Sequence, residues 1–241
     1  MCGICGCSTP VPPLPPPRRL ALEQAVLSRN TSQAAHNRQH FEQHGLLVVN
    51  LLSAPGSGKT ALLEQLARRW PQGPLGVIVG DLATDNDARR LQAAGARAQQ
   101  IQTGDLCHLE AAQVDQAFRQ LDSSGMALLV IENVGNLVCP TAFALGEQRR
   151  LALLSVTEGE DKPLKYPALF QSADAVVINK IDLAAAVGFD RSLALATIQA
   201  VAPQAHILEL SARSGAGLEA LIAWLEQQRA ELALTAHAHQ H

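Results

Sequence analysis

A short run of small residues, placed between an apolar segment and a helical pattern, most constrains how this chain can fold. Residues 46–52 read LLVVNLL, and residues 53–60 read SAPGSGKT. The second run matches the phosphate-binding loop GxxxxGK[ST], with Ser53 where the first glycine usually stands. Such a loop needs a strand before it and a helix after it, because loop N–H groups and the positive end of the helix must face the phosphates. Both patterns are present, so the sequence predicts a P-loop nucleotide-binding fold.

The residue types of this loop fit phosphate chemistry. Gly56 and Gly58 lack a Cβ, so their backbone can turn toward a phosphate, and Ser57 between them offers a further N–H group. Lys59 is predicted to neutralise the β- and γ-phosphates, and the hydroxyl of Thr60 is predicted to bind Mg²⁺. We therefore expect these five residues to bind a nucleoside triphosphate.

Apolar runs alternate with helical patterns along the rest of the chain. Runs of strand length lie at 46–52, 76–80, 126–132, 151–156, 174–180 and 206–210. Helical patterns follow several of them, at 59–70, 85–96 and 216–230. Continuous apolar strands separated by helices are typical of a mostly parallel sheet with helices on both faces. The predicted class is α/β, with an aliphatic core because only 3% of the residues are aromatic.

The chain divides into segments of different composition. We expect a cysteine motif at 1–9, a proline-rich linker at 10–17, a helical segment at 18–45, a nucleotide-binding domain at 46–230 and a short histidine-containing tail at 231–241. The linker, PVPPLPPP, is predicted to be a stiff polyproline II spacer, the alternative being a disordered connection. The helical segment is expected to break near Asn30 and Thr31, where a cap could restart it.

Two later motifs indicate which base is bound. The run 174–180 ends in an N-K-x-D sequence formed by Asn179, Lys180 and Asp182. The carboxylate of Asp182 can accept both N–H groups on the guanine edge, which adenine does not offer. Lys180 would lie over the base, and Asn179 would tie this loop to the phosphate loop. Ser211 and Ala212 follow the run 206–210 and resemble the loop whose N–H meets guanine O6. Their order after the phosphate loop predicts GTP.

Acidic residues at strand ends are candidates for the switch that senses the γ-phosphate. Glu132 ends the run 126–132 and is predicted to approach Mg²⁺, and Gly135 is predicted to donate its N–H to the γ-phosphate. Asp81, after the run 76–80, is expected to contact Mg²⁺ or to orient the attacking water. Asp85 and Asp87 are alternatives to Asp81. Helix capping or exposure in a loop is the alternative for both Asp81 and Glu132.

The five cysteines are Cys2, Cys5, Cys7, Cys107 and Cys139. Each stands near another thiol or another ligand type, which is typical of a protein that handles a soft metal. Cys107 and His108 are adjacent, and Cys139 lies four residues after Gly135. Two thiolates and an imidazole suit Zn²⁺ or Ni²⁺, with a fourth ligand from water or a second chain. The alternative for Cys107 is a small buried apolar residue, and His108 is expected to open the next helix.

Composition excludes several classes of function. The formal charge is −3 without a long basic run, so nucleic acid is not expected as a partner. No apolar run approaches the ~20 residues that span a bilayer, and the N-terminus does not resemble a secretory signal. Thiols at metal-ligand spacing fit a reducing compartment. We therefore expect a cytoplasmic protein without a membrane partner.

Histidines form two further groups. His36, His40 and His44 recur every four residues in the helical segment, and the tail at 236–241 reads AHAHQH. The first group could bind a metal, but a solvated, mildly basic helix face is the interpretation that we favour. The tail is expected to be a frayed, solvated end.

The motifs jointly resemble one family, the nickel-incorporation GTPases of hydrogenase maturation, or HypB family. The matching stretches are MCGICGC, NLLSAPGSGKT, GDLATDNDARR, TGDLCHLEA, IENVGNLVCP, VVINKIDL and LSARSGAGL. The resemblance covers residues 1 to about 220, and this family accepts serine at the position of Ser53. It implies a SIMIBI-type P-loop GTPase that dimerises around nucleotide and delivers Ni²⁺ to the precursor of the [NiFe]-hydrogenase large subunit.

The same resemblance implies two metal sites. Cys2, Cys5 and Cys7 would bind Ni²⁺ tightly, with the terminal amine as a candidate fourth ligand. Cys107, His108 and Cys139 would form a weaker Ni²⁺ or Zn²⁺ site near the dimer interface. A small zinc-containing nickel chaperone would be a further partner. Slow hydrolysis is expected because the sequence offers no identifiable arginine finger. Two other functions remain as alternatives: a nickel buffer whose GTPase activity is incidental, and a zinc-stabilised GTPase that serves another assembly.

Overall fold

The computed structural model describes residues 16–81, 86–104 and 106–238. For residues 16–23, 81 and 235–238 it describes the backbone alone. Cys2, Cys5 and Cys7, most of the proline-rich linker, and Asp85 lie outside the described residues.

The strands form one parallel sheet, as the apolar runs predict. Its order is β3-β2-β4-β1-β5-β6-β7, and every neighbouring pair is parallel. Because β1 lies in the middle, the loop that follows it opens at the centre of the sheet's carboxyl edge. The strands are β1 (Leu47–Ser53), β2 (Leu75–Asp81), β3 (Arg97–Gln102), β4 (Leu128–Glu132), β5 (Arg149–Ser155), β6 (Ala175–Asn179) and β7 (His206–Glu209).

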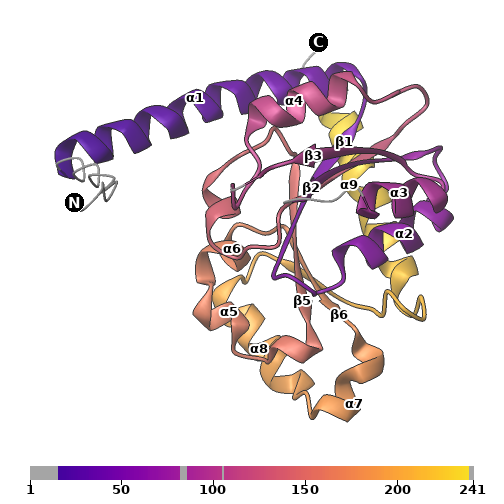
Figure 1. Cartoon of the computed structure of the whole chain (residues 1–241). Coiled ribbons are helices and arrows are strands. Elements are labelled where there is room, and N and C mark those ends of the chain that lie inside the picture. Colours follow the sequence, from indigo (N-terminus) through magenta and orange to yellow (C-terminus); the bar gives the residue numbers. More distant parts are fainter. Residues whose placement is uncertain (1–15, 82–85, 105, 239–241) are drawn as a thin grey trace, which may run out of the picture.

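Helices connect the strands and cover both faces of the sheet (Figure 1). None of those in the described ranges combines the length and the apolar character needed to cross a membrane. The α-helices are α1 (Pro16–Gln43), α2 (Lys59–Arg69), α3 (Asn86–Ala93), α4 (Ala111–Arg119), α5 (Lys162–Lys165), α6 (Pro167–Gln171), α7 (Ala184–Val187), α8 (Arg191–Val201) and α9 (Leu218–Ala238). Short 3-10 turns are η1 (Cys139–Ala142), η2 (Val156–Glu158) and η3 (Ile181–Leu183).

Alternation along the strands divides the core into two layers, one on each face of the sheet. In β1, Leu47, Val49 and Leu51 pack toward α2, α3 and α9. Val48 and Leu52 face the other side, where they belong to separate apolar clusters. The cluster around Val48 is covered by α1 and α4, and the cluster around Leu52 by α6 and α8.

The predicted break in the first helix is wrong, because α1 runs without interruption from Pro16 to Gln43. Asn30 does not cap a new helix. Its Nδ2 donates to Ala144 O at 2.8 Å and its Oδ1 accepts from Ala111 N at 2.8 Å. Two turns further along, Asn37 Nδ2 donates to Ala111 O at 2.7 Å and to Leu145 O at 3.0 Å. These tertiary partners outcompete local capping.

Three other features of the secondary structure differ from the prediction: one strand and the boundaries of two helices. The edge strand β3 was not predicted, because its sequence RAQQIQ is largely polar and only two of its residues are buried. His108 does not open a helix, since α4 begins at Ala111 with Glu110 as its N-cap. The last helix, predicted to end at residue 230, continues to Ala238.

Candidate functional site

The phosphate loop joins the end of β1 to the start of α2 and is shaped by two glycines. Gly56 has φ 74° and Gly58 has φ 99°, a left-handed backbone that glycine adopts without strain. A Cβ at Gly58 would also lie 2.6 Å from Nδ2 of Asn179. The loop therefore needs glycine at position 58 for its conformation and for its contact with a neighbouring segment.

Ser53 has a hydrogen-bonding role that a glycine could not supply. It is fully buried, and its Oγ accepts from the ammonium of Lys59 at 2.9 Å and from Ser57 Oγ at 2.6 Å. The same hydroxyl donates to Ala54 O at 2.8 Å. Ser53 thus gives the Lys59 ammonium an oxygen partner, which a phosphate oxygen would replace.

One amide, that of Asn179, ties together the loops of the predicted nucleotide site. Its Nδ2 donates to Ser57 O in the phosphate loop at 2.8 Å, as the sequence predicted. Its Oδ1 accepts from Lys180 N at 2.7 Å and from Ala212 N at 3.0 Å. The ammonium of Lys180 adds a bond to Gly56 O at 2.7 Å. Segments that are far apart in sequence thus meet at one point.

The residues predicted to recognise the base are sequence neighbours of Asn179 and Ala212. Lys180 has φ 63°, the one positive φ of a non-glycine residue in the described part of the chain. Such strain persists only where the surroundings fix it and is common at binding sites. Asp182 follows in η3 and is exposed. Ser211 is buried, and its N–H donates to Ala216 O at 2.9 Å. Hydrogen bonds therefore hold the loop after β7 in a defined conformation. The carboxylate of Asp182 is exposed and available to a base.

Glu132 ends β4 inside the phosphate site. Its side chain is 4% exposed, and its Oε1 accepts from the hydroxyl of Thr60 at 2.8 Å. Its other oxygen, Oε2, is buried and has no hydrogen-bond partner among the described residues. Burial raises the pKa of this carboxyl to about 7, against the nearby ammonium of Lys59, which lowers it. A buried carboxylate oxygen without a partner, beside a threonine hydroxyl, is a donor set that fits Mg²⁺.

Gly135, Asp81 and Asp87, the other residues predicted to belong to the switch, lie in three different elements or loops. Gly135 packs against the phosphate loop, because a Cβ there would lie 3.0 Å from Pro55 Cα. The backbone of Asp81 ends β2, next to β4, but its side chain is not described. Asp87, one of the alternatives, lies in the first turn of α3 and pairs with Arg90 at 3.1 Å. The close approach of Gly135 is what a γ-phosphate sensor requires.

The second cysteine group comes together at Cys107. Its Sγ lies 3.7 Å from Nδ1 of His108. A hydrogen bond with the thiol of Cys139, at the start of η1, is the main reason why the pKa of Cys107 is raised. Both thiols are free and half-buried. The structure thus places each of the other two predicted ligands beside Cys107.

His108 is suited to bind a metal. Its ring stacks on Phe143 with centroids 3.8 Å apart. Its Nε2 is buried without a hydrogen-bond partner in the described structure. Burial lowers the pKa of the imidazole, so the neutral form that binds metals prevails at neutral pH. The described ranges contain no closed group of three His, Cys, Asp or Glu side chains able to hold a metal ion, so binding requires a side-chain shift or a further ligand.

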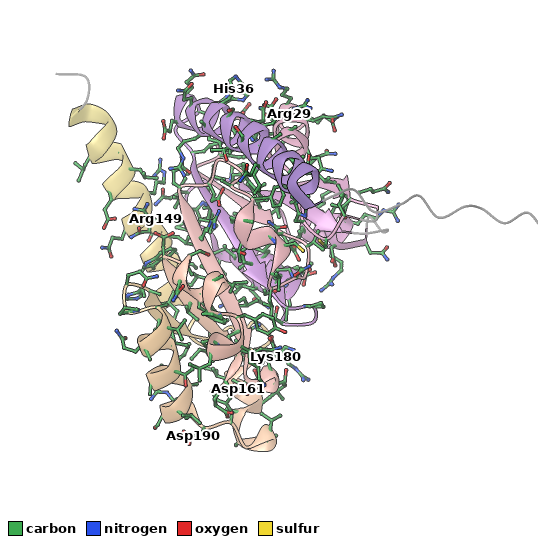
Figure 2. All side chains as sticks on the ribbon, turned by 90° about the vertical axis from the view of Figure 1, so that its left-hand side faces the viewer. Arg29, His36, Arg149, Asp161, Lys180 and Asp190 are labelled. Atoms are coloured by element: carbon green, nitrogen blue, oxygen red, sulfur yellow. The ribbon has the colours of Figure 1, made fainter. Side chains whose placement is uncertain are left out.

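The histidines of α1 differ in their surroundings. His36 is exposed on the outer side of the helix (Figure 2). His40 and His44 instead pack edge-on against Phe118 of α4, with ring centroids 5.2 Å and 5.3 Å from it. The expected solvated face holds for His36 and His44, which are both exposed, whereas His40 is half-buried.

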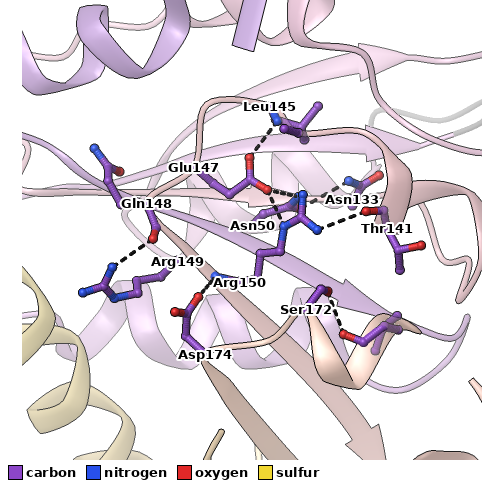
Figure 3. Close-up of polar contacts among 12 residues, drawn as sticks. Asn50, Asn133, Thr141, Leu145, Glu147, Gln148, Arg149, Arg150, Ser172 and Asp174 are labelled. Carbon is purple, nitrogen blue, oxygen red and sulfur yellow. Dashed lines mark hydrogen bonds and ion pairs between the residues drawn. The ribbon is translucent and has the colours of Figure 1, made fainter. Parts of the chain in front are cut away.

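Sequence reasoning missed a buried polar network under the site, formed by Asn50, Asn133, Glu147 and Arg150 (Figure 3). We call it the seam network. Asn50 is a single polar residue inside an apolar strand, which is a signal that the sequence does carry. Glu147 and Arg150 lie in the run GEQRR, which looks like an exposed turn and gives no such signal.

Comparisons with known proteins agree with this geometry. A model of the CobW/HypB/UreG nucleotide-binding domain matches residues 47–209. The hydrogenase maturation factor HypB of Azotobacter vinelandii is 50% identical over 222 residues, which is 90% of this chain and 72% of that protein. HypB of Escherichia coli strain K12 is 47% identical over 213 residues, 88% of this chain and 73% of that protein.

Solved structures extend the agreement to three dimensions. HypB from Helicobacter pylori, crystallised in complex with nickel, superposes with a TM-score of 0.81 at 40% identity, covering 84% of this chain and 96% of that chain. The signal recognition particle 54 kDa protein of Aeropyrum pernix K1 superposes with a TM-score of 0.54 at 18% identity over 78% of this chain and 50% of that one, which shows a shared P-loop fold. The chain belongs to the HypB family of hydrogenase maturation factors, within the CobW/HypB/UreG nucleotide-binding group.

Proposed function

We propose that this protein hydrolyses GTP and uses the nucleotide cycle to deliver Ni²⁺ to the precursor of the [NiFe]-hydrogenase large subunit. Family membership supports the pathway, and the Helicobacter pylori relative was crystallised with nickel. The observation that carries the proposal is local. Cys139 lies four residues beyond Gly135, which packs on the phosphate loop, and Cys139 lies close enough to Cys107 to raise the pKa of that thiol. The phosphate sensor and the cargo ligand thus share one short segment.

Guanine is the base that this site would recognise. The exposed carboxylate of Asp182 has its oxygens available for the two N–H groups on the guanine edge. The N–H of Ala212 donates to Asn179 Oδ1 at 3.0 Å, which ties the loop after β7 to the N-K-x-D segment, and this N–H would exchange Asn179 for guanine O6. Adenine would leave these groups unpaired, which costs binding free energy.

Hydrolysis would follow from positioning and charge. Lys59 would move from Ser53 to the β- and γ-phosphates, and Thr60 and Glu132 would hold Mg²⁺, directly or through water. The N–H of Gly135 would meet the γ-phosphate, and Asp81 would contact the metal or orient the water. Mg²⁺ would supply charge neutralisation on the phosphates. The reaction is expected to be slow without an arginine from another molecule.

The metal cargo would use two sites. Cys2, Cys5 and Cys7 would bind Ni²⁺ tightly, and Cys107, His108 and Cys139 would form the switch-proximal site for Ni²⁺ or Zn²⁺. A second copy of the chain would complete that site in a nucleotide-dependent homodimer. The zinc-containing nickel chaperone and the hydrogenase precursor would be the partners, all in the cytoplasm.

The test measures nickel binding to the switch-proximal site in two nucleotide states. The full chain carrying Cys2→Ser, Cys5→Ser and Cys7→Ser is titrated with Ni²⁺, once with Mg·GDP and once with a non-hydrolysable Mg·GTP analogue. The thiolate-to-nickel absorbance reports binding, and a further Cys107→Ser substitution is the blank. Different affinities in the two states are expected, and equal affinities would refute the coupling.

A complementation experiment separates this function from its alternatives. Lys59→Ala should abolish hydrogenase activation if GTP drives delivery. Intact activation in that variant would point to a nickel buffer. Failure of added nickel to relieve the defect of a strain lacking the protein would point to a zinc-stabilised GTPase for another assembly.

A further inference from the structure

The seam network interrupts an otherwise apolar core. Asn50 lies in the middle of β1, fully buried, between Val48 and Leu52 on the same side of the sheet. Those two neighbours belong to separate apolar clusters, one under α1 and α4 and the other under α6 and α8. The network therefore fills the seam between two parts of the core. Asn133 joins it to residues 132–135 at the end of β4, which we call the switch segment.

One branch of the network leads from the switch segment to the first metal-ligand pair. Asn133 directly follows Glu132 and is 1% exposed. Its Oδ1 accepts from Leu109 N at 3.3 Å and from Val134 N at 2.9 Å. Leu109 directly follows His108, so the backbone that carries Cys107 and His108 is attached to the switch segment by this amide.

The other branch leads to the remaining ligand. Asn133 Nδ2 donates to Asn50 Oδ1 at 3.2 Å, and Asn50 Nδ2 donates to Glu147 Oε1 at 3.3 Å. Arg150 Nε donates to the same carboxylate oxygen at 2.7 Å, and its Nη1 donates to Thr141 O at 3.0 Å (Figure 3). Thr141 belongs to η1, which begins at Cys139. The chain of bonds thus ends on the turn that presents Cys139.

Energetics argue for a positioning role. Glu147 is 4% exposed and Arg150 has a side-chain exposure of 17%, so this ion pair is largely desolvated. Apolar residues often replace such a pair without loss of stability, whereas a fully bonded polar group admits few alternative geometries. The second oxygen of Glu147 is also satisfied, by Leu145 N at 2.7 Å. The network therefore holds one particular arrangement of the segments that it joins.

We propose that Asn50, Asn133, Glu147 and Arg150 are positioning residues that carry the state of the nucleotide to the switch-proximal metal site. The amide of Asn133 holds both branches. A shift of the segment 132–135 on binding a γ-phosphate would change the spacing between the Cys107–His108 backbone and the turn of Cys139. By linkage, metal binding would alter nucleotide affinity by the same factor. This inference rests on the proposed function, because it assigns the residues that produce its coupling.

The experiment compares variants by one ratio, the nickel affinity with a Mg·GTP analogue over that with Mg·GDP, in the full chain with its three N-terminal cysteines replaced by serine. Arg150→Lys keeps a positive charge for Glu147 but cannot reach both acceptors. Asn50→Ser cuts the same branch at another point and leaves the ion pair intact. Arg149→Lys is the matched control, since Arg149 donates to Gln148 O, outside the network (Figure 3).

We expect a parent ratio that differs from one by about fivefold or more, in either direction, as is usual for coupled sites. Arg150→Lys and Asn50→Ser should each bring it close to one, and the double variant should lose no more than either, because the two act in series. Arg149→Lys should keep the parent ratio.

The outcomes separate this inference from the proposed function. A purely structural role would lower the melting temperature and weaken nickel binding equally in both nucleotide states, leaving the ratio at the parent value. That result in both single variants overturns the inference and leaves the proposed function standing. A parent ratio of one overturns both. If Arg150→Lys does not fold, Asn50→Ser alone decides.

Discussion

Glu132→Gln is predicted to make the nucleotide-free protein more stable, by an amount that depends on pH. In the folded chain burial raises the pKa of Glu132 to about 7, from an ordinary value of 4.5. The difference corresponds to about 3 kcal/mol, since one pKa unit is about 1.4 kcal/mol. The folded state therefore binds this proton more tightly than the unfolded state does.

The sign of the effect follows from that difference. The stabilising contribution of the protonated carboxyl is fully present below pH 4.5 and is lost as the pH rises through about 7. Glutamine cannot ionise, and it keeps an acceptor for the Thr60 hydroxyl. The variant should exceed the parent in unfolding free energy by under about 1 kcal/mol at pH 5 and by about 3 kcal/mol at pH 8.

Guanidinium unfolding of nucleotide-free protein in EDTA, at pH 5, 7 and 8, measures this difference. Glu42→Gln, at an exposed carboxylate of α1, is the control. Its unfolding free energy should stay close to that of the parent at all three pH values. With saturating Mg·GDP the order should reverse, because Mg²⁺ binding favours the ionised parent side chain. Parallel curves for Glu132→Gln and the parent between pH 5 and pH 8 would refute the assigned environment of this carboxyl.

Three further substitutions test the nucleotide site and the helix that supports it. Gly58→Ala should lower the unfolding free energy by about 2 kcal/mol and abolish binding of a fluorescent GDP analogue, because φ is 99° and the new Cβ would lie 2.6 Å from Asn179 Nδ2; normal binding would contradict this. Asp182→Asn should leave the melting temperature unchanged, because the side chain is exposed, and should shift preference in a competition assay from GDP to xanthosine diphosphate, whose base accepts where guanine donates; retained GDP preference would exclude the assigned contact. Asn37→Ala removes the donor to two buried carbonyls and should cost about 2–4 kcal/mol in urea unfolding, so a loss below about 0.5 kcal/mol would show that those carbonyls find other partners.

The shape of the phosphate loop and the contact of Asn179 with it were predictable because the chemistry of such loops dictates residue type and spacing locally. Gly58, Lys59 and Thr60 must follow one another at a helix start, and Asn179 must end the strand that brings it to the loop. The other strands of the sheet were predictable from apolar runs, because burial on both faces of a parallel sheet also dictates residue type locally. The exception, β3, is an edge strand whose residues are mostly polar and only partly buried, so its sequence resembles a loop.

Features that depend on distant partners could not be predicted. Asn30 looks like a helix cap, yet its amide bonds to Ala144, 114 residues away. The pairing of Asn50 with Glu147 spans 97 residues, and nothing in the local sequence links the two. The proximity of Cys107 and Cys139 was expected from the pairing of ligand types, but among the described residues no three ligand side chains lie close enough to hold a metal ion.

The attachment of α1 also decides where the chain can be divided. Its Phe41 is fully buried in the core, and its side-chain amides satisfy backbone groups at the start of α4 and before β5. A fragment starting at residue 46 would open an apolar face and leave those groups bare. A fragment starting at residue 16 would keep every one of these contacts. A truncation that separates the proposed N-terminal nickel site from the proposed nucleotide-binding domain should therefore leave α1 in place, and a fragment for nucleotide-binding experiments can begin at Pro16.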